Sequence, residues 1–283
     1  MTSRRESSPV LHRRAFVLGG LALGCASKLQ RGAEAVPRAA RTVRVLTLNL
    51  AHGRGRSPLQ STVRRAPWYE RNLAVIAEML RREDADVVAL QEAEGGSRWA
   101  GAFDHVAVLG DAAGYAFRVF DAHVVTPGRH RYGTALLSRF PVIAAQGHTF
   151  ATQGRWAKGF SCATLETARG PVVFASVHLD FASAVRRRLQ AEEIVARLRG
   201  SARPQIWMGD YNDVGIAPDD AIQTLLRSHL LAAVDPDDVI THPGVRRRLD
   251  WILVSPGIAA RSARVLRDRL SDHRAVVADL ALP

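Results

Sequence analysis

The chain has 283 residues, of which 47% are hydrophobic, enough to bury the core of one large domain. Its formal net charge of +12 favours polyanionic partners such as nucleic acid or an anionic lipid surface. Charge alone does not choose between them, because a basic surface often reflects solvation. The two cysteines exclude a disulfide framework once the N-terminal segment is removed, because only Cys162 then remains.

Residues 1–35 have the pattern of an export signal. Residues 12–16 contain paired arginines and, two positions after them, a phenylalanine. The apolar stretch at 15–26 is too short to span a bilayer, and small residues at 33–35 offer a cleavage point. We expect a twin-arginine-type signal peptide that delivers the folded protein to the periplasm or the exterior. An ordinary secretory peptide is the alternative, with the same destination.

Cys25 offers a second way of processing this segment. Residues 21–25, Leu-Ala-Leu-Gly-Cys, loosely resemble a lipoprotein signal, after which Cys25 would carry a lipid anchor. The leucine two positions before the cysteine is uncommon in such signals, so cleavage near residue 35 is the first expectation. Cys162 lies in an apolar run and is expected to be a buried, inert thiol.

Hydrophobic periodicity and turn residues predict the elements in chain order. After a linker at 36–41, the pattern predicts a strand at 42–50, an amphipathic helix at 68–82 and a strand at 86–91. Further strands are expected at 115–120, 132–138, 142–149, 160–166 and 171–178. From residue 182 to the end of the chain, the pattern predicts helices at 182–199 and 219–229, and strands at 205–209, 248–254 and 274–281. In the helix at 182–199, the side chains expected to face inward are Leu189, Ile194, Val195 and Leu198, and those expected outward are Arg186, Arg187 and Arg188.

The number of strands decides the fold class. With so few helices, the strands cannot all belong to βαβ units, and short turns such as 140–141 and 169–171 imply hairpins. Two mixed sheets packed face to face, with helices outside, would bury this many apolar strands. We therefore expect an α/β fold, a four-layer α/β sandwich of two packed mixed β-sheets flanked by helices, formed by one domain over 42–283.

Six polar clusters at the edges of apolar strands are the most informative feature. Four of them end a strand and two begin one. If the last two strands run antiparallel to the others, all six clusters meet at one edge. An edge that gathers carboxylates, amides and histidines indicates an active site with a metal ion. The clusters are Asn49, Gln91-Glu92, His178, residues 209–212 (Gly-Asp-Tyr-Asn), Asp250 and residues 271–273 (Ser-Asp-His).

In this order the clusters resemble the motifs of the endonuclease/exonuclease/phosphatase superfamily, which includes DNase I. The resemblance spans residues 42–281 and implies a DNase I-like sandwich that hydrolyses phosphate esters. The matching motifs are Thr-x-Asn at 47–49, Gln-Glu at 91–92, Gly-x-Ala-x-Leu-Ser-Arg at 133–139, His-Leu at 178–179, Gly-Asp-Tyr-Asn at 209–212, Leu-Asp-x-Ile at 249–252 and Ser-Asp-His at 271–273.

The resemblance implies a metal site. A phosphodiester repels hydroxide, so its hydrolysis needs charge neutralisation, an activated water and a stabilised leaving oxygen. Glu92 is the expected main ligand of Mg²⁺, for which Mn²⁺ can substitute, because a hard cation prefers carboxylate oxygen. Asn49 would supply a neutral oxygen to the metal or to a water beside it, and Asp272 a second carboxylate.

The catalytic candidates surround the phosphate. Asp210 and Asn212 are two apart in an extended segment, so their side chains project to the same side. One would orient or deprotonate the attacking water, and the other would donate a hydrogen bond to a phosphate oxygen. His273 is expected to act with Asp250, because a carboxylate fixes the imidazole tautomer. The base is either His273 itself, or Asp210 with His273 binding the phosphate.

Two further residues are candidates for contacts with the substrate. His178 would be a general acid or a phosphate hydrogen-bond donor. Arg139 would contact phosphate, with a surface position before Phe140 as the alternative. The histidines that match no motif are expected at the surface or in loops, namely His52, His105, His123, His130 and His148.

The leading interpretation is an exported Mg²⁺-dependent phosphodiesterase. Within this class we favour a nuclease, with nucleic acid as its polyanionic substrate. No stable protein partner is implied. A phospholipid or phosphoinositide hydrolase on the same fold is the first alternative. No long apolar hairpin that would dip into a membrane is evident, although residues 99–103 are a candidate lipid contact. A non-catalytic binding protein is the second alternative, disfavoured because no expected catalytic position has been replaced.

Overall fold

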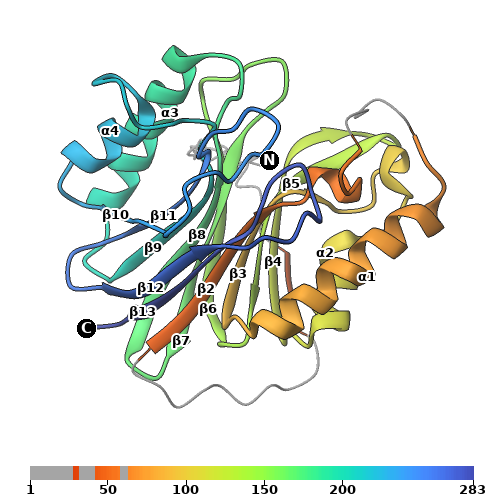
Figure 1. The fold of residues 1–283 in the computed structure, drawn as a ribbon, viewed down its shortest axis with the longest axis horizontal. Helices are drawn as coiled ribbons and strands as arrows, with labels where there is room; N and C mark the ends of the chain where they lie inside the picture. The colour runs from red at the N-terminus through yellow and green to blue at the C-terminus, as the bar shows by residue number, and fades with distance from the viewer. Residues whose placement is uncertain (1–27, 32–41, 58–62) are drawn as a thin grey trace, which may run out of the picture.

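In the computed structural model, which describes residues 28–31, 42–57 and 63–283, the chain forms two β-sheets with helices on their outer faces (Figure 1). The first sheet has the order β1-β4-β5-β3-β2-β13-β12, with bounds Lys28–Arg31 (β1), Phe117–Thr126 (β4), His130–Ser138 (β5), Val87–Glu94 (β3), Thr42–Asn49 (β2), Val276–Ala281 (β13) and Ala259–Val265 (β12). The second has the order β10-β11-β9-β8-β7-β6, with bounds Ala232–Val234, Asp250–Val254, Gln205–Asp210, Gly170–His178, Gly159–Thr167 and Val142–Thr149. Both sheets are mixed, because β2 pairs with β3 and β8 with β9 in parallel, whereas the other pairs are antiparallel.

The helices form the two outer layers. Helices α1 (Ala66–Glu83) and α2 (His105–Ala113) share a hydrophobic core with the first sheet, and α3 (Ala184–Arg199) and α4 (Ala221–Arg227) share one with the second. Two short 3-10 turns, η1 (Ala51–Gly53) and η2 (Arg98–Ala100), follow β2 and β3. The predicted four-layer α/β sandwich is confirmed. No helix in the described ranges has both the length and the apolar character needed to cross a membrane.

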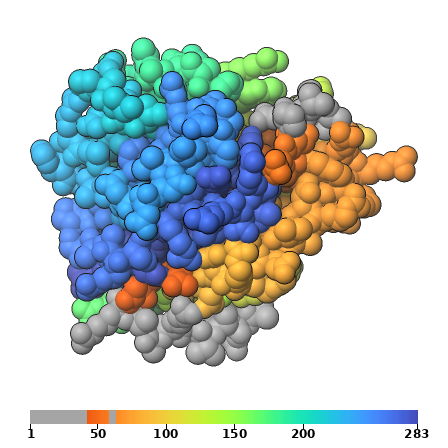
Figure 2. Space-filling model, viewed as in Figure 1, coloured from red at the N-terminus to blue at the C-terminus, as the bar shows by residue number. Residues whose placement is uncertain are grey.

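The alternation of side chains along the central strands builds the layers. In β2, Val43 and Val45 belong to the core between the sheets, whereas Leu46 and Leu48 belong to the core under α1 and α2. Successive side chains of a strand point to opposite faces, so a strand that is apolar at every position is buried on both. In space-filling view, the C-terminal third of the chain lies against the N-terminal part in one continuous surface (Figure 2).

The predicted helices form, but one of their faces was predicted wrongly. Leu73, Ile76 and Leu80 are buried in α1, in agreement with the spacing. In α3, however, Leu189 is 37% exposed and Gln190 is fully buried. The amide of Gln190 accepts from the N–H of Asp180 and donates to the carbonyl of Thr152, so hydrogen bonds with two loops set the phase of this helix.

Helix α2 and strands β10 and β12 were not predicted. Helix α2 has nine residues and contains Gly110, which leaves little periodic signal, although Asp104 caps it by accepting from the N–H of Ala107. Strand β12 lies at a sheet edge and its residues 259–262 are exposed, so it has no apolar pattern. Strand β1 lies within the segment 1–35 that is expected to be a signal peptide, whose remaining residues lie outside the described ranges.

A buried histidine lies between the two sheets. The ring of His123 in β4 has Nε2 2.9 Å from the hydroxyl of Thr134 and Nδ1 3.2 Å from that of Thr149. Burial first, and the nearby charges of Lys158 and His148 second, lower the pKa of His123 to about 3. The expectation that His123 lies at the surface or in a loop was therefore wrong, because it is buried in β4.

This histidine predicts a loss of stability in mild acid. Its pKa is lower in the folded chain than in the unfolded one, so the unfolded chain binds the proton first, and stability falls as pH drops from about 6.5 towards 3. The slope due to one such group is at most about 1.4 kcal/mol per pH unit. Urea unfolding of a His123→Gln variant between pH 7 and 5 should show a shallower dependence on pH than the wild type. The exposed His229, changed to Gln, is the control and should leave the dependence unchanged.

Candidate active site

The six polar clusters meet at one edge of the sandwich. Parallel pairing aligns Asn49 with Gln91 in the first sheet and His178 with Asp210 in the second, and antiparallel pairing aligns Asp250 with Asp210. A cavity of ≈ 830 Å³ opens at this edge. It is lined by seven of the candidate residues, whereas Asp250 and Arg139 do not line it; the seven are Asn49, Glu92, His178, Asp210, Asn212, Asp272 and His273.

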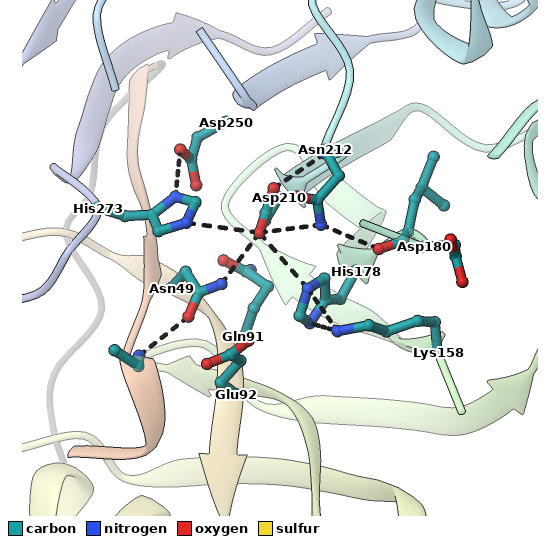
Figure 3. Close-up of polar contacts among 12 residues, drawn as sticks. Asn49, Gln91, Glu92, Lys158, His178, Asp180, Asp210, Asn212, Asp250 and His273 are labelled. Carbon is teal, nitrogen blue, oxygen red and sulfur yellow. Dashed lines mark hydrogen bonds and ion pairs between the residues drawn. The ribbon is translucent and has the colours of Figure 1, made fainter. Parts of the chain in front are cut away.

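His273 and Asp250 form an imidazole–carboxylate couple. Nδ1 of His273 donates to Oδ2 of Asp250 at 2.8 Å, and its Nε2 lies 3.7 Å from Oδ2 of Asp210 (Figure 3). Burial alone would lower the pKa of His273, but the charges of Asp250 and Asp210 outweigh it and raise the pKa to about 10. The ring is thus held as an imidazolium between two carboxylates at neutral pH.

Asp210 is the centre of the hydrogen-bond network. Its Oδ2 accepts from the amide of Asn49 at 3.0 Å and lies 3.4 Å from Nε2 of His178, and its Oδ1 accepts from the backbone N–H of Asn212 at 2.9 Å (Figure 3). Burial raises the pKa of Asp210, the charge of His273 opposes this rise and the charge of Asp250 adds to it, so that the pKa is raised to about 6. A carboxylate with this environment is suited to accept a proton near neutral pH.

Lys158 is a site residue that sequence reasoning missed. Its Nζ lies 2.8 Å from Nε2 of His178 and 3.2 Å from Nδ1, and its side chain lines the cavity although it is buried. Burial lowers the pKa of Lys158, opposed by the negative charges of Glu92 and Asp210. The pKa of His178 is also lowered, by burial first and by the charge of Lys158 second. The two side chains therefore place hydrogen-bond donors and positive charge on the wall of the cavity.

The oxygen donors of the cavity fit a hard divalent cation. The carboxylates of Glu92 and Asp272 and the amide of Asn49 line the same cavity, and such oxygens are the ligands that Mg²⁺ prefers. Asn49 has a second function, because its Oδ1 accepts from the N–H of Ala51 while its Nδ2 donates to Asp210. A second group, Asp210, Asp250 and His273, has its ligand atoms within 4.8 Å of one another. It is less suitable for a metal, because an imidazolium has no free lone pair.

Arg139 is not part of the site, so the expected phosphate contact was wrong. Strands β3 and β5 are antiparallel, with Val87 opposite Ser138, so the end of β5 lies at the start of β3, at the opposite edge from Glu92. Arg139 forms an ion pair with Asp84 there, and its backbone N–H donates to the carbonyl of Asp86. The alternative that the sequence left open, a surface arginine before Phe140, does not describe it either, because its side chain is only 17% exposed.

Three of the histidines that match no motif are buried, in contrast to the expectation for them. His52 contacts Glu92 and Glu94, and the ring Nε2 of His105 lies 2.8 Å from the carbonyl of Ala100. Burial lowers the pKa of His105. His52 lies three residues after the Thr-x-Asn motif. This closeness to a site motif is the sequence signal that could have identified it as a site residue. Cys162 is a buried free thiol, as predicted.

Aromatic and basic side chains form the outer part of the cavity. Residues 99–103 were a candidate lipid contact, but only Trp99 of this segment lines the cavity, and Ala100 is buried. Arg187, predicted to face outward on α3, also lines the cavity and pairs with Asp213 at 3.4 Å. The other aromatic and basic residues that line the cavity include Tyr132, Trp156, Phe181, Arg155, Arg247 and His242.

A four-layer sandwich that gathers hard oxygen donors and a histidine–carboxylate couple in one cavity defines a hydrolase of phosphate esters. The sequence model of the Endonuclease/Exonuclease/phosphatase family matches residues 46–273, and the chain belongs to this family. Among curated proteins, Protein cwh43 of Schizosaccharomyces pombe is 32% identical over 131 residues. The match covers 43% of this chain and 13% of that protein, so the two share only a small part of the yeast protein's length.

Solved structures share the fold at low sequence identity. An endonuclease/exonuclease/phosphatase from Beutenbergia cavernae is 24% identical with a TM-score of 0.68, covering 86% of this chain and 72% of that one. Sphingomyelinase C from Streptomyces griseocarneus is 19% identical with a TM-score of 0.63, covering 84% and 99%. The human Nocturnin catalytic domain, solved with a bound sulfate anion, is 20% identical with a TM-score of 0.63, covering 91% and 98%. These similarities establish the fold but do not identify the substrate.

Proposed function

We propose that the chain is an Mg²⁺-dependent phosphodiesterase, and that an exported nuclease is the best assignment of its activity. One observation carries this proposal. His178 and His273 both face Asp210, and Lys158 contacts His178, in a cavity that also contains the carboxylates of Glu92 and Asp272. The site thus offers positive charge to a phosphate, a carboxylate to a water and oxygen ligands to a cation within one space.

Glu92 and Asp272 are the proposed ligands of the cation, with Asn49 as a neutral oxygen donor. When bound, the cation would neutralise phosphate charge and lower the pKa of a bound water. Mn²⁺ is the expected substitute, since it accepts the same oxygen ligands.

The proton transfers are assigned to the chain's own residues. Asp210 is the proposed base, because its oxygens face the cavity and its pKa is raised by burial. His273 is the proposed phosphate ligand, because both of its ring nitrogens face carboxylates and hold protons, so it cannot accept another. Of the two accounts that the sequence left open, this proposal adopts the second.

His178 and Lys158 are proposed to act on the other oxygens of the phosphate. They lie on the opposite side of Asp210 from His273, so a phosphate above Asp210 would be within reach of both groups (Figure 3). His178 would donate to the leaving oxygen, and Lys158 would both bind the phosphate charge and supply that proton in turn. Asn212, whose amide donates to the carbonyl of Leu179 and to Asp210, is proposed to hold the base in place.

The basic outer part of the cavity favours nucleic acid as the substrate. Arg155, Arg187 and Arg247 line it, and arginine side chains contact the phosphates of a polynucleotide backbone. A phospholipid is the second candidate, favoured by the exposed apolar side chains of Phe181 and Val245 on the same cavity. Such side chains are suited to contact a membrane surface.

A substrate panel distinguishes these candidates. The protein should hydrolyse bis(nitrophenyl) phosphate with Mg²⁺ or Mn²⁺ and lose this activity in EDTA. Nicking of plasmid DNA or cleavage of RNA, without cleavage of sphingomyelin in vesicles, is the expected result. Lipid cleavage without nuclease activity would select the second candidate. Activity that is unchanged in EDTA would contradict the proposed use of a cation, and the absence of hydrolysis on every substrate would favour a binding protein.

Export remains a prediction from the sequence, because residues 1–27 lie outside the described ranges. We propose that the twin-arginine-type segment delivers the enzyme to the periplasm or the exterior, with lipid attachment at Cys25 as the alternative. Fractionation of cells that produce the full chain, with and without an Arg13→Lys and Arg14→Lys double change, tests this proposal. Equal amounts of exported protein from both forms would contradict twin-arginine transport.

A further inference from the structure

A second imidazole–carboxylate couple, formed by His52 and Glu94, lies at the cavity. His52, in the turn after β2, has Nδ1 2.6 Å from Oε1 of Glu94 and Nε2 3.2 Å from Oε2 of Glu92. All three side chains are largely removed from solvent, and that of Glu94 is fully buried. The imidazole is thus fixed at one nitrogen by a buried carboxylate and directs the other to a carboxylate of the cavity.

This arrangement repeats that of His273. There, Nδ1 contacts the buried Asp250 and Nε2 faces Asp210, the proposed base. Here, Nδ1 contacts the buried Glu94 and Nε2 faces Glu92, the proposed cation ligand. Each couple therefore orients one of the carboxylates on which the proposed chemistry depends.

The backbone at both ends of the contact is in a conformation that side chains rarely adopt. The φ angle is +55° at His52 and +49° at Glu92, both in the left-handed region. The pairing of β3 with β5 also shifts register between Leu90 and Ala93, so Glu92 lies in a bulge that redirects its side chain. Such strained positions persist where the surrounding structure holds them, and they are concentrated at functional sites.

Aromatic groups lock the ring of His52 in place. Trp99 and Tyr132 pack edge-on against it, each with ring centroids 4.7 Å away. The indole N–H of Trp99 donates to Oε1 of Glu94 at 3.0 Å, and the guanidinium of Arg54 lies 4.0 Å from the centre of the indole ring. The couple therefore has little freedom to turn away from Glu92.

We propose that Glu94 and His52 are positioning residues that hold the Glu92 carboxylate in the orientation in which it binds the divalent cation. This inference rests on the proposed function, in which Glu92 is the cation ligand. Groups that orient a metal ligand through a hydrogen bond contribute about 10–100-fold to metal affinity. His52→Ala and Glu94→Ala should therefore each weaken Mn²⁺ binding to the full chain by about 10–100-fold.

The mechanism predicts how the variants combine. If Glu94 acts through His52, the double variant His52→Ala/Glu94→Ala should bind Mn²⁺ no more weakly than His52→Ala alone. Glu94→Gln keeps an oxygen that accepts from Nδ1, so its affinity should recover to within about tenfold of the wild type or better. The control is His130→Ala, because His130 packs against the same Trp99 at 5.1 Å but contacts neither glutamate in the described structure. Its affinity should be unchanged.

The test measures Mn²⁺ binding by electron paramagnetic resonance and calorimetry, with circular dichroism to show that each variant is folded. Activity gives a second measurement, because the cation concentration for half-maximal rate should rise while the rate at saturating cation stays near that of the wild type. Wild-type affinity in His52→Ala, or an equal loss in His130→Ala, would overturn the inference alone. A wild-type protein that binds no Mn²⁺, or whose binding survives Glu92→Gln, would overturn the proposed function as well. If His52→Ala does not fold, the Mn²⁺ affinities of Glu94→Ala and Glu94→Gln test the inference in its place.

Discussion

Replacing His273 with glutamine is expected to lower the turnover number by about 10²–10³-fold. The imidazolium is fixed by Asp250 at 2.8 Å and faces the proposed base, so no neutral amide reproduces its charge or its position. Asp250→Asn should cause a loss of similar order, because it removes the charge that holds the ring protonated. The measurement is steady-state hydrolysis of bis(nitrophenyl) phosphate at saturating Mg²⁺, which separates kcat from KM.

The losses of turnover caused by His273→Gln and Asp250→Asn should not be additive. Because Asp250 acts through His273, the double variant should be about as slow as the slower single variant. His229→Gln and Asp235→Asn change the same residue types at exposed positions and should retain the wild-type rate to within about twofold. Additive losses would show that Asp250 has a separate effect. A His273 variant that is folded and has near-normal turnover would refute the catalytic assignment of this residue.

The sequence revealed the residues at the ends of strands and missed those placed by other contacts. Asn49, Glu92, His178 and Asp210 each end an apolar run, and strand pairing then aligns them at one edge. Lys158 instead comes just before β7, and it reaches His178 because Gly159 pairs with His178 across the hairpin. That register depends on the packed sheet, and no local pattern in the sequence shows it.

The direction of a strand explains the error at Arg139. A motif records the order of residues but not which way its strand runs through the sheet. Strand β5 ends at Ser138 beside the start of β3, so the arginine that follows lies far from the polar ends of β3 and β2. The same limit applied to the strands near Asp250 and His273, whose antiparallel direction was a condition of the sequence argument. Pairing of β11 with β9 and of β13 with β2 meets that condition.

Buried polar groups were the second source of error. His52 and His123 were expected at the surface or in loops because they match no motif. Both are buried because each finds partners on elements distant in the sequence, Glu94 for the first and Thr134 with Thr149 for the second. Burial of a polar side chain depends on such partners, which exist only after the two sheets have formed.

Replacing Glu92 with glutamine should remove the response of the enzyme to divalent cations. The variant keeps the size of the side chain and an oxygen to accept from His52, but it loses the charge that a hard cation requires. We expect turnover to fall by at least about 10²-fold and Mn²⁺ binding to be undetectable at concentrations that saturate the wild type. Titration of activity and of electron paramagnetic resonance with Mn²⁺ measures both effects on the same sample.

A matched change separates this effect from a general loss of negative charge. Glu166→Gln, on the exposed face of β7, removes the same charge and should leave both titrations unchanged. Asp272→Asn should weaken binding less than Glu92→Gln, because Asp272 is held by one described hydrogen bond, from Ser271, whereas Glu92 is fixed by a bulge and by His52. If the Glu92→Gln variant still binds Mn²⁺, the cation site must instead be assigned to the group formed by Asp210, Asp250 and His273. The base and the phosphate ligand would then have to be assigned to other residues, with Lys158 and His178 as the remaining donors in the cavity.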